Sequence, residues 1–157
     1  MAGPGLIVLY GGTFDPVHNG HLAIARAAAQ ALGSVVRLMP AADPPHRPAP
    51  GASAQQRAHM LDLAVQGDPD LCVDRRELER EGPSYTVQTL RELRAADPRV
   101  PVALLVGADS FLGLPGWREW NELFALTHFV IADRPGDAWR PETLPEALAA
   151  EADGRWT

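Results

Sequence analysis

Short apolar runs alternate with longer helical patterns along most of the chain. Five runs rich in Val, Leu and Ile are typical of buried strands. They lie at Leu6–Tyr10, Val35–Met39, Leu71–Asp74, Val102–Val106 and His128–Ala132. Segments with apolar residues at helical spacing lie at Gly20–Leu32, Ala54–Gln66, Thr86–Ala96 and Trp117–Phe124. In the second of these we expect Met60, Leu61, Leu63 and Ala64 to point mostly inward. Strands that alternate with helices favour right-handed crossovers and a parallel sheet that helices cover on both faces.

Two loops of unusual composition follow the first and fourth predicted strands. They read GGTFDPVHNGH (residues 11–21) and GADSFLG (residues 107–113). In open parallel sheets, ligands bind beyond the carboxyl ends of the strands, at the point where the strand order reverses. If the first strand lies beside the fourth, both loops flank such a crevice, and we expect the ligand there.

The first loop combines several features of a phosphate-binding site. Gly11 and Gly12 allow the backbone to turn sharply and to approach a ligand closely. His21 falls in the first turn of the expected helix, where free N–H groups and the helix dipole favour phosphate. We expect His18 and His21 to reach one anion from opposite sides. The alternatives are a tight turn with two satisfied histidines and a metal site, for which nearby residues supply too few further ligands.

The composition excludes several kinds of chemistry. All 14 cationic side chains are arginine, so the chain has neither a P-loop lysine nor a Schiff-base lysine. The one cysteine, Cys72, lies in an apolar run, which predicts a buried structural thiol and favours a cytoplasmic location. The net charge of −6 and the scattered arginines argue against a nucleic-acid surface. No apolar run approaches the ~20 residues that cross a membrane.

Several stretches of the sequence resemble a known family. GGTFDPVHNGH resembles the signature loop of the HxGH nucleotidylyltransferase superfamily, with His18-Asn19-Gly20-His21 as the motif. The segments MPAADPPHRPAP, QQRAHMLDLA, GPSYTVQTL and GADSFLGLPGWREW are similar, in this order, to those of the bacterial nicotinate mononucleotide adenylyltransferases. The resemblance implies a Rossmann-like, doubly wound parallel α/β sheet in a single domain over residues 1–157. It also implies an enzyme of NAD biosynthesis that transfers the adenylyl group of ATP to nicotinate mononucleotide.

The resemblance also implies a role for particular residues. It makes His18 and His21 catalytic. It places ATP against Gly11, Gly12, Thr13, Phe14, His18, His21, Gly107, Asp109 and Arg134. It places the acceptor against Thr13, His46, Arg47, Ser84, Tyr85, Thr86, Asp109 and Trp117. Mg²⁺ comes in with ATP, held by phosphates and water, so no residue is expected to ligate a metal.

Two of the acceptor assignments have a direct physical basis. A carboxylate at the start of the helix that begins at Thr86 gains from the free N–H groups and the dipole, which favours the acid form of the acceptor over the amide. Trp117 is large enough for the pyridine ring to stack on it. The structural alternatives are helix capping for Ser84, Thr86 and Asp109, a core anchor for the tryptophans, and solvated surface charges for Arg47 and Arg134.

Four rival interpretations follow from the same residues. The acceptor could be nicotinamide mononucleotide or phosphopantetheine, the chain could be a non-catalytic nucleotide-binding module, or the histidine pair could serve a zinc-dependent hydrolase. The family's Ser-Ser-Thr-x-x-Arg motif, which contacts the ATP phosphates, has no counterpart after Gly136. We therefore expect residues 1–157 to lack the family's C-terminal segment, to bind the acceptor and to turn over poorly. The oligomeric state is not indicated.

Overall fold

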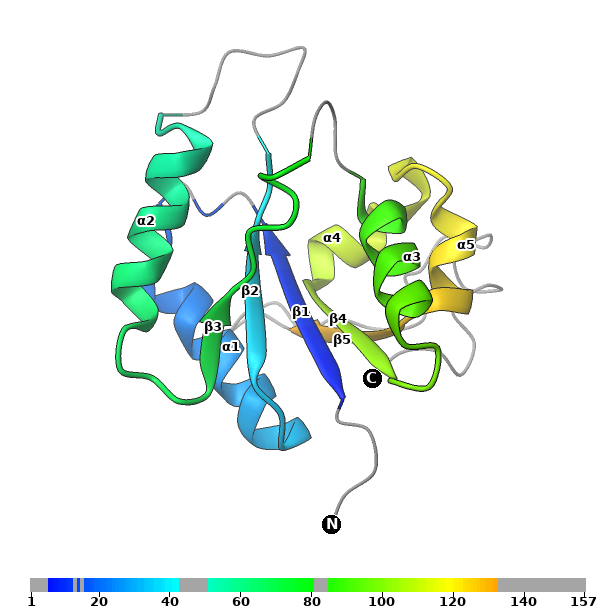
Figure 1. Ribbon diagram of the computed structural model, residues 1–157, viewed down its shortest axis with the longest axis horizontal. Helices are drawn as coiled ribbons and strands as arrows, with labels where there is room; N and C mark the ends of the chain where they lie inside the picture. Colours follow the sequence, from blue (N-terminus) through cyan, green and yellow to red (C-terminus); the bar gives the residue numbers. More distant parts are fainter. Residues whose placement is uncertain (1–5, 13, 15, 43–50, 81–84, 133–157) are drawn as a thin grey trace.

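The computed structural model describes residues 6–132, apart from residues 13, 15, 43–50 and 81–84 and the side chain of Asp109. Within these residues five strands form a sheet in the order β3-β2-β1-β4-β5, and every neighbouring pair is parallel (Figure 1). The strands are β1 (Ile7–Gly12), β2 (Val36–Pro40), β3 (Leu71–Val73), β4 (Val102–Gly107) and β5 (His128–Ala132). The helices are α1 (Asn19–Leu32), α2 (Ala54–Val65), α3 (Thr86–Ala96), α4 (Ala108–Leu112) and α5 (Trp120–Leu126), with a 3₁₀ turn η1 (Leu114–Gly116) before α5.

Helices cover both faces of the sheet. Successive residues of each strand point to opposite faces, so each strand contributes side chains to both layers. On one face, Val8 and Tyr10 of β1 pack in a buried cluster with residues of α1 and α2. On the other face, Leu9 packs with residues of α3, α4 and α5 (Figure 1). These two clusters confirm the doubly wound parallel sheet that the sequence predicts. None of the helices described here has the length and apolar character needed to span a membrane.

The strand order reverses between β1 and β4. The chain steps from β1 outward to β2 and β3, and then returns to β4 on the other side of β1. Tyr10 of β1 pairs with Leu105 of β4, and each strand ends two residues further on, at Gly12 and Gly107. The condition for the ligand crevice is therefore met, because the two unusual loops leave neighbouring strands at the same edge of the sheet.

The helix predicted from Trp117 to Phe124 starts three residues later in the structure, at Trp120. Pro115 lies in the short turn η1, whose end leaves Trp117 with extended backbone (φ −82°, ψ 148°). Glu119 then takes the left-handed conformation (φ 50°) at the N-cap of α5. The apolar spacing of this segment fits one continuous helix, but a left-handed residue cannot belong to a right-handed helix, so α5 begins after Glu119.

Two predictions of burial are wrong. Cys72 is exposed, because it pairs with Arg37 on the face of the edge strand opposite to the one that α1 and α2 cover. Leu63 of α2, predicted to point inward, is 60% exposed. Arg57 is fully buried on the face of α2 that carries Leu61, one helical turn later. Residues four apart share a helix face, so the spacing from Leu61 predicts that position 57 faces the core. The charge of Arg57 argues against burial and so misleads a prediction from the sequence.

Candidate active site

The residues that the sequence assigns to catalysis gather at the carboxyl edge of the sheet. Gly12 ends β1 and Gly107 ends β4, its neighbour. A helix that follows a strand of a parallel sheet runs back along it, so α1 begins at this same edge. His18 and His21 lie at the beginning of α1. The strand ends and the two imidazoles thus frame the point where the strand order reverses.

His18 and His21 form a reciprocal hydrogen-bonded pair. His18 is the N-cap residue of α1, and its Nδ1 accepts a hydrogen bond from the His21 N–H at 3.3 Å. In return, Nδ1 of His21 accepts a hydrogen bond from the His18 N–H at 3.1 Å. The two ring centroids lie 3.7 Å apart, with 21° between the ring planes. The imidazoles are stacked face to face, so no anion fits between them. The expectation that they reach one anion from opposite sides is therefore wrong.

These hydrogen bonds fix the proton positions on both rings. A backbone N–H can only donate, so each Nδ1 is an unprotonated acceptor. In a neutral imidazole the single ring proton then lies on Nε2. Both histidines therefore present an Nε2–H donor beside the start of a helix, where the N–H groups of Asn19 and Gly20 have no intrahelical acceptor. This set of donors suits the oxygens of a phosphate group.

A buried aromatic ring supports His21. Phe14 is 3% exposed, and its ring meets the His21 ring at right angles, with 5.0 Å between centroids. Tyr10 packs against Phe14 in turn, at 5.5 Å. Burial lowers the pKa of His21 below its ordinary value, and the charge of His18 lowers this pKa further. The side chain of Phe14 thus packs against His21, and the contact of Phe14 with ATP stays a prediction.

Stability should depend on the protonation of His21. Its pKa is lowered in the folded state, so the unfolded chain binds the proton more readily, and stability is lost as the pH falls below about 6.5. Protonation of Nδ1 also removes the acceptor for the His18 N–H. In His21→Asn the amide oxygen can still accept that hydrogen bond but does not titrate. We expect the melting temperature to fall less in His21→Asn than in the wild type between about pH 7.5 and about pH 5.5; an equal fall in both proteins would contradict this account.

The glycine between the two histidines is required by the geometry of the pair. A Cβ atom on Gly20 would lie 2.9 Å from both Nδ1 and Cε1 of the His18 ring. Such a distance is too short for a real contact, so the ring would have to move away from the His21 N–H. The H-x-G-H spacing therefore keeps one glycine where the His18 ring folds back over the helix start.

We expect Gly20→Ala to lower kcat by about tenfold or more, because the displaced ring no longer presents its Nε2–H correctly. The melting temperature should change little, since the lost cap and the better helix propensity of alanine are each worth about 1 kcal/mol and oppose each other. Gly33→Ala at the other end of α1 is the matched control. Gly33 has φ 63°, so alanine there should lower the melting temperature and leave kcat unchanged. A lower melting temperature with an unchanged kcat in Gly20→Ala would show that Gly20 has only a structural role.

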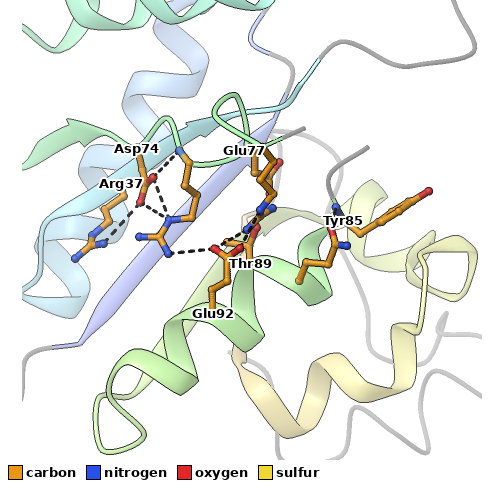
Figure 2. A network of polar contacts seen from close by, with 9 residues as sticks. Arg37, Asp74, Glu77, Tyr85, Thr89 and Glu92 are labelled. Atoms are coloured by element: carbon orange, nitrogen blue, oxygen red, sulfur yellow. Dashed lines mark hydrogen bonds and ion pairs between the residues drawn. The ribbon is translucent and has the colours of Figure 1, made fainter. Parts of the chain in front are cut away.

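A polar network anchors α3 to the segment that follows β3. The buried Thr89 donates a hydrogen bond to the carboxylate of Glu77 at 2.9 Å, and burial raises the pKa of this carboxyl group. Glu92 pairs with Arg80 at 2.8 Å. Figure 2 shows this network beside α3, with Tyr85 at the start of the helix extending away from it. The network therefore fixes the position of the N-terminus of α3.

The start of α3 lies next to the segment that carries Trp117. Tyr85 is the N-cap residue of α3, so Thr86 is the first helical residue and the interpretation of Thr86 as a cap is wrong. Arg118 stacks its guanidinium over the Tyr85 ring, 4.7 Å from the centroid. Trp117 is partly buried against the core cluster, as is Trp120. The structure thus brings Tyr85, at the start of α3, together with Arg118 of the GWREW stretch.

Several predicted site residues lie outside what the structure describes. These are Thr13, His46, Arg47, Ser84 and Arg134. Asp109 is the second residue of α4, which excludes it from the N-cap position, but its side chain is not among the described groups. Among the described residues, no three His, Cys, Asp or Glu side chains lie close enough together to hold a metal ion.

Comparison with known proteins gives consistent results. The cytidylyltransferase-like family matches residues 9–153. A probable nicotinate-nucleotide adenylyltransferase of Stenotrophomonas maltophilia is 56% identical, over 96% of this chain and 70% of the relative. One of Xylella fastidiosa is 51% identical, over 98% of this chain and 71% of the relative. Among solved structures, nicotinic acid mononucleotide adenylyltransferase of Plasmodium falciparum in complex with NaAD has the same fold, with a TM-score of 0.75 and 14% identity over 99% of this chain and 74% of that protein.

Proposed function

Since the chain belongs to the nicotinate-nucleotide adenylyltransferase family, we propose that it transfers the adenylyl group of ATP to nicotinate mononucleotide, as a step in NAD biosynthesis. The products are nicotinate adenine dinucleotide and pyrophosphate. The observation that carries this proposal is the His18–His21 pair, whose two Nε2–H donors lie at the start of α1 beside the reversal of strand order.

The reaction needs positioning more than it needs acid–base chemistry. An oxygen of the mononucleotide phosphate attacks the α-phosphorus of ATP in line. A new P–O bond forms as the bond from the α-phosphorus to the α,β-bridging oxygen breaks, and pyrophosphate leaves with the bonding electron pair. A phosphate monoester is already an anion near neutral pH, with a second pKa of about 6, so no general base is required. Catalysis then rests on bringing two polyanions together and stabilising the charge that develops.

His18 and His21 supply the stabilisation in this proposal. Their Nε2–H groups donate to oxygens of the α-phosphate and of the departing pyrophosphate, where negative charge grows in the transition state. The lowered pKa of His21 keeps its ring neutral, with the proton on the donating nitrogen. The main-chain N–H of Gly12 and the predicted Thr13, Gly107, Asp109 and Arg134 contacts complete the ATP site in the proposal.

The metal in this proposal is Mg²⁺ that enters with ATP. The groups at the start of α1 are N–H donors, which bind phosphate oxygens and leave the metal to be ligated mainly by phosphates and water. Bound in this way, Mg²⁺ offsets charge on the outer phosphates. The cytoplasmic location stays a prediction of the sequence.

The acceptor half of the site lies at the start of α3. We assign the pyridine ring to Trp117 and the carboxylate to the first turn of α3, at Tyr85 and Thr86 with the predicted Ser84. Gln88 Oε1 accepts a hydrogen bond from the N–H of Tyr85 at 3.1 Å. Among the described residues no side chain accepts a hydrogen bond from the N–H of Thr86 or Val87, so these two groups suit a carboxylate. The predicted His46 and Arg47 contribute at the phosphate end of the acceptor.

The reaction is tested with two labelled forms of ATP, incubated with Mg²⁺ and with each candidate acceptor. With nicotinate mononucleotide, a label on the α-phosphate should appear in the dinucleotide, and a label on the γ-phosphate should appear in pyrophosphate. A γ-label transferred to the acceptor would indicate a kinase, and release of label independent of any acceptor would indicate a hydrolase. Either result would overturn the proposal.

A further inference from the structure

Glu119 has a backbone conformation that residues other than glycine rarely adopt. Its φ of 50° and ψ of 41° place it in the left-handed region, which among the described non-glycine residues it shares only with Phe14. Such a conformation is unfavourable and persists where the surroundings hold it. Phe14 supports His21 in the catalytic half of the site. Glu119 follows Trp117 by two residues, so the second such residue lies beside the acceptor half.

An ion pair holds Glu119 against α3. Both carboxylate oxygens accept hydrogen bonds from the guanidinium of Arg91, in the second turn of α3, each at 3.2 Å. The hydrogen bonds and the charge of Arg91 lower the pKa of the Glu119 carboxyl group. About half of each side chain remains exposed, 48% for Arg91 and 47% for Glu119. An ion pair this exposed contributes little to stability, whereas its bidentate geometry fixes orientation.

A second contact joins the same two segments. The guanidinium of Arg118 lies 4.7 Å from the ring centroid of Tyr85, the N-cap residue of α3. Two consecutive residues, Arg118 and Glu119, are thus tied to the first two turns of α3. Trp117 immediately precedes them. Its backbone is extended and does not belong to a helix. Core packing also holds Trp117, and these two contacts add a direct link between its segment and the start of α3.

We propose that Arg91 and Glu119 are positioning residues that set the spacing between Trp117 and the N-terminus of α3. This inference rests on the proposed function, in which Trp117 stacks on the pyridine ring and the start of α3 binds its carboxylate. Ring and carboxylate belong to one rigid group, so both contacts form together only at one spacing. The ion pair thereby determines the affinity for the acid acceptor and has no effect on the ATP half of the site.

The test compares variants of the pair in the whole chain. Arg91→Met and Glu119→Ala each remove the ion pair, and the exchange of the two charges (Arg91→Glu with Glu119→Arg) restores it. Glu119→Gly removes the ion pair and also relieves the left-handed backbone. Arg26→Met is the matched control, because Arg26 forms an ion pair with Asp68 at 2.8 Å and is 47% exposed, away from Trp117 and α3. The readouts are KM for nicotinate mononucleotide, KM for ATP, and melting temperature.

We expect Arg91→Met and Glu119→Ala each to raise KM for nicotinate mononucleotide about three- to fivefold, the largest effect that an exposed ion pair allows. The double variant Arg91→Met with Glu119→Ala should raise KM no more than either single variant, and the charge exchange should restore KM. KM for ATP should not change in any variant, and Arg26→Met should match the wild type. Glu119→Gly should raise KM for the acceptor as Glu119→Ala does, without a lower melting temperature.

Two results would overturn the inference while the proposed function stands. One is an unchanged acceptor KM in Arg91→Met, Glu119→Ala and Glu119→Gly. The other is an equal rise in KM for both substrates, which would indicate a general loosening of the structure. A wild-type chain that forms no dinucleotide from nicotinate mononucleotide would overturn the proposed function, and this inference with it. The two failures are distinguishable because only the second appears in the wild type.

Discussion

Replacement of His21 by alanine should lower kcat by about 100- to 1000-fold, the usual cost of losing one donor to a developing oxyanion. His21 contributes twice in the proposed mechanism. Its Nε2–H donates to the transferring phosphoryl group, and its Nδ1 accepts the hydrogen bond that orients the backbone of His18. The stacked His18 ring loses its neighbour as well, so both donors are affected. Steady-state pyrophosphate release at saturating substrates measures the effect.

The control is His59→Ala, an exposed histidine on α2 that has no place in the proposed site. It should leave kcat unchanged. Alanine at position 21 should lower the melting temperature only modestly, because the His18 N–H that loses its acceptor is exposed and can bind water. A wild-type kcat in His21→Ala together with a clear fall in melting temperature would show that the pair only caps α1.

The regular elements were predictable where the apolar pattern is clean and the flanking residues agree with it. The boundaries predicted for α3 and for β5 are those of the structure, and Gly33 closes α1 in the left-handed conformation expected of a C-cap glycine. The adjacency of β1 and β4 was a condition of the sequence argument, and the structure meets it. The sequence therefore supplied the two unusual loops, and the strand order of the structure brings their starting points together.

Details that depend on side-chain torsions and on contacts between distant segments could not be predicted from the sequence. The stacking of His18 on His21 depends on side-chain torsions at the helix start, about which a three-residue spacing says nothing. The exposure of Cys72 depends on which face of an edge strand remains uncovered. The Arg91–Glu119 ion pair joins residues 28 positions apart, and neither residue is unusual in its own segment. The helix start at Trp120 depends on the left-handed conformation of Glu119, for which a glutamate gives no sequence signal.

The choice of acceptor is the second large effect that we expect. The acid acceptor should be used about 10- to 100-fold better than nicotinamide mononucleotide, measured as kcat/KM. A hydrogen bond from a backbone N–H contributes roughly 1.5–3 kcal/mol to a charged carboxylate and roughly 0.5–1.5 kcal/mol to a neutral amide oxygen. One or two such bonds therefore favour the acid by roughly 1–3 kcal/mol. The dipole of α3 adds to the preference, because its positive end lies at Thr86. The stacking surface at Trp117 serves both rings equally and should not discriminate.

The deciding measurement is kcat/KM for these two acceptors, with ATP and Mg²⁺ saturating and the dinucleotide product quantified. We expect nicotinate mononucleotide to yield nicotinate adenine dinucleotide, with a kcat/KM about 10- to 100-fold above that of the amide. Equal values for the two acceptors would contradict the assignment of the carboxylate to the start of α3. A preference for the amide, or no dinucleotide from either acceptor, would contradict the proposed function itself.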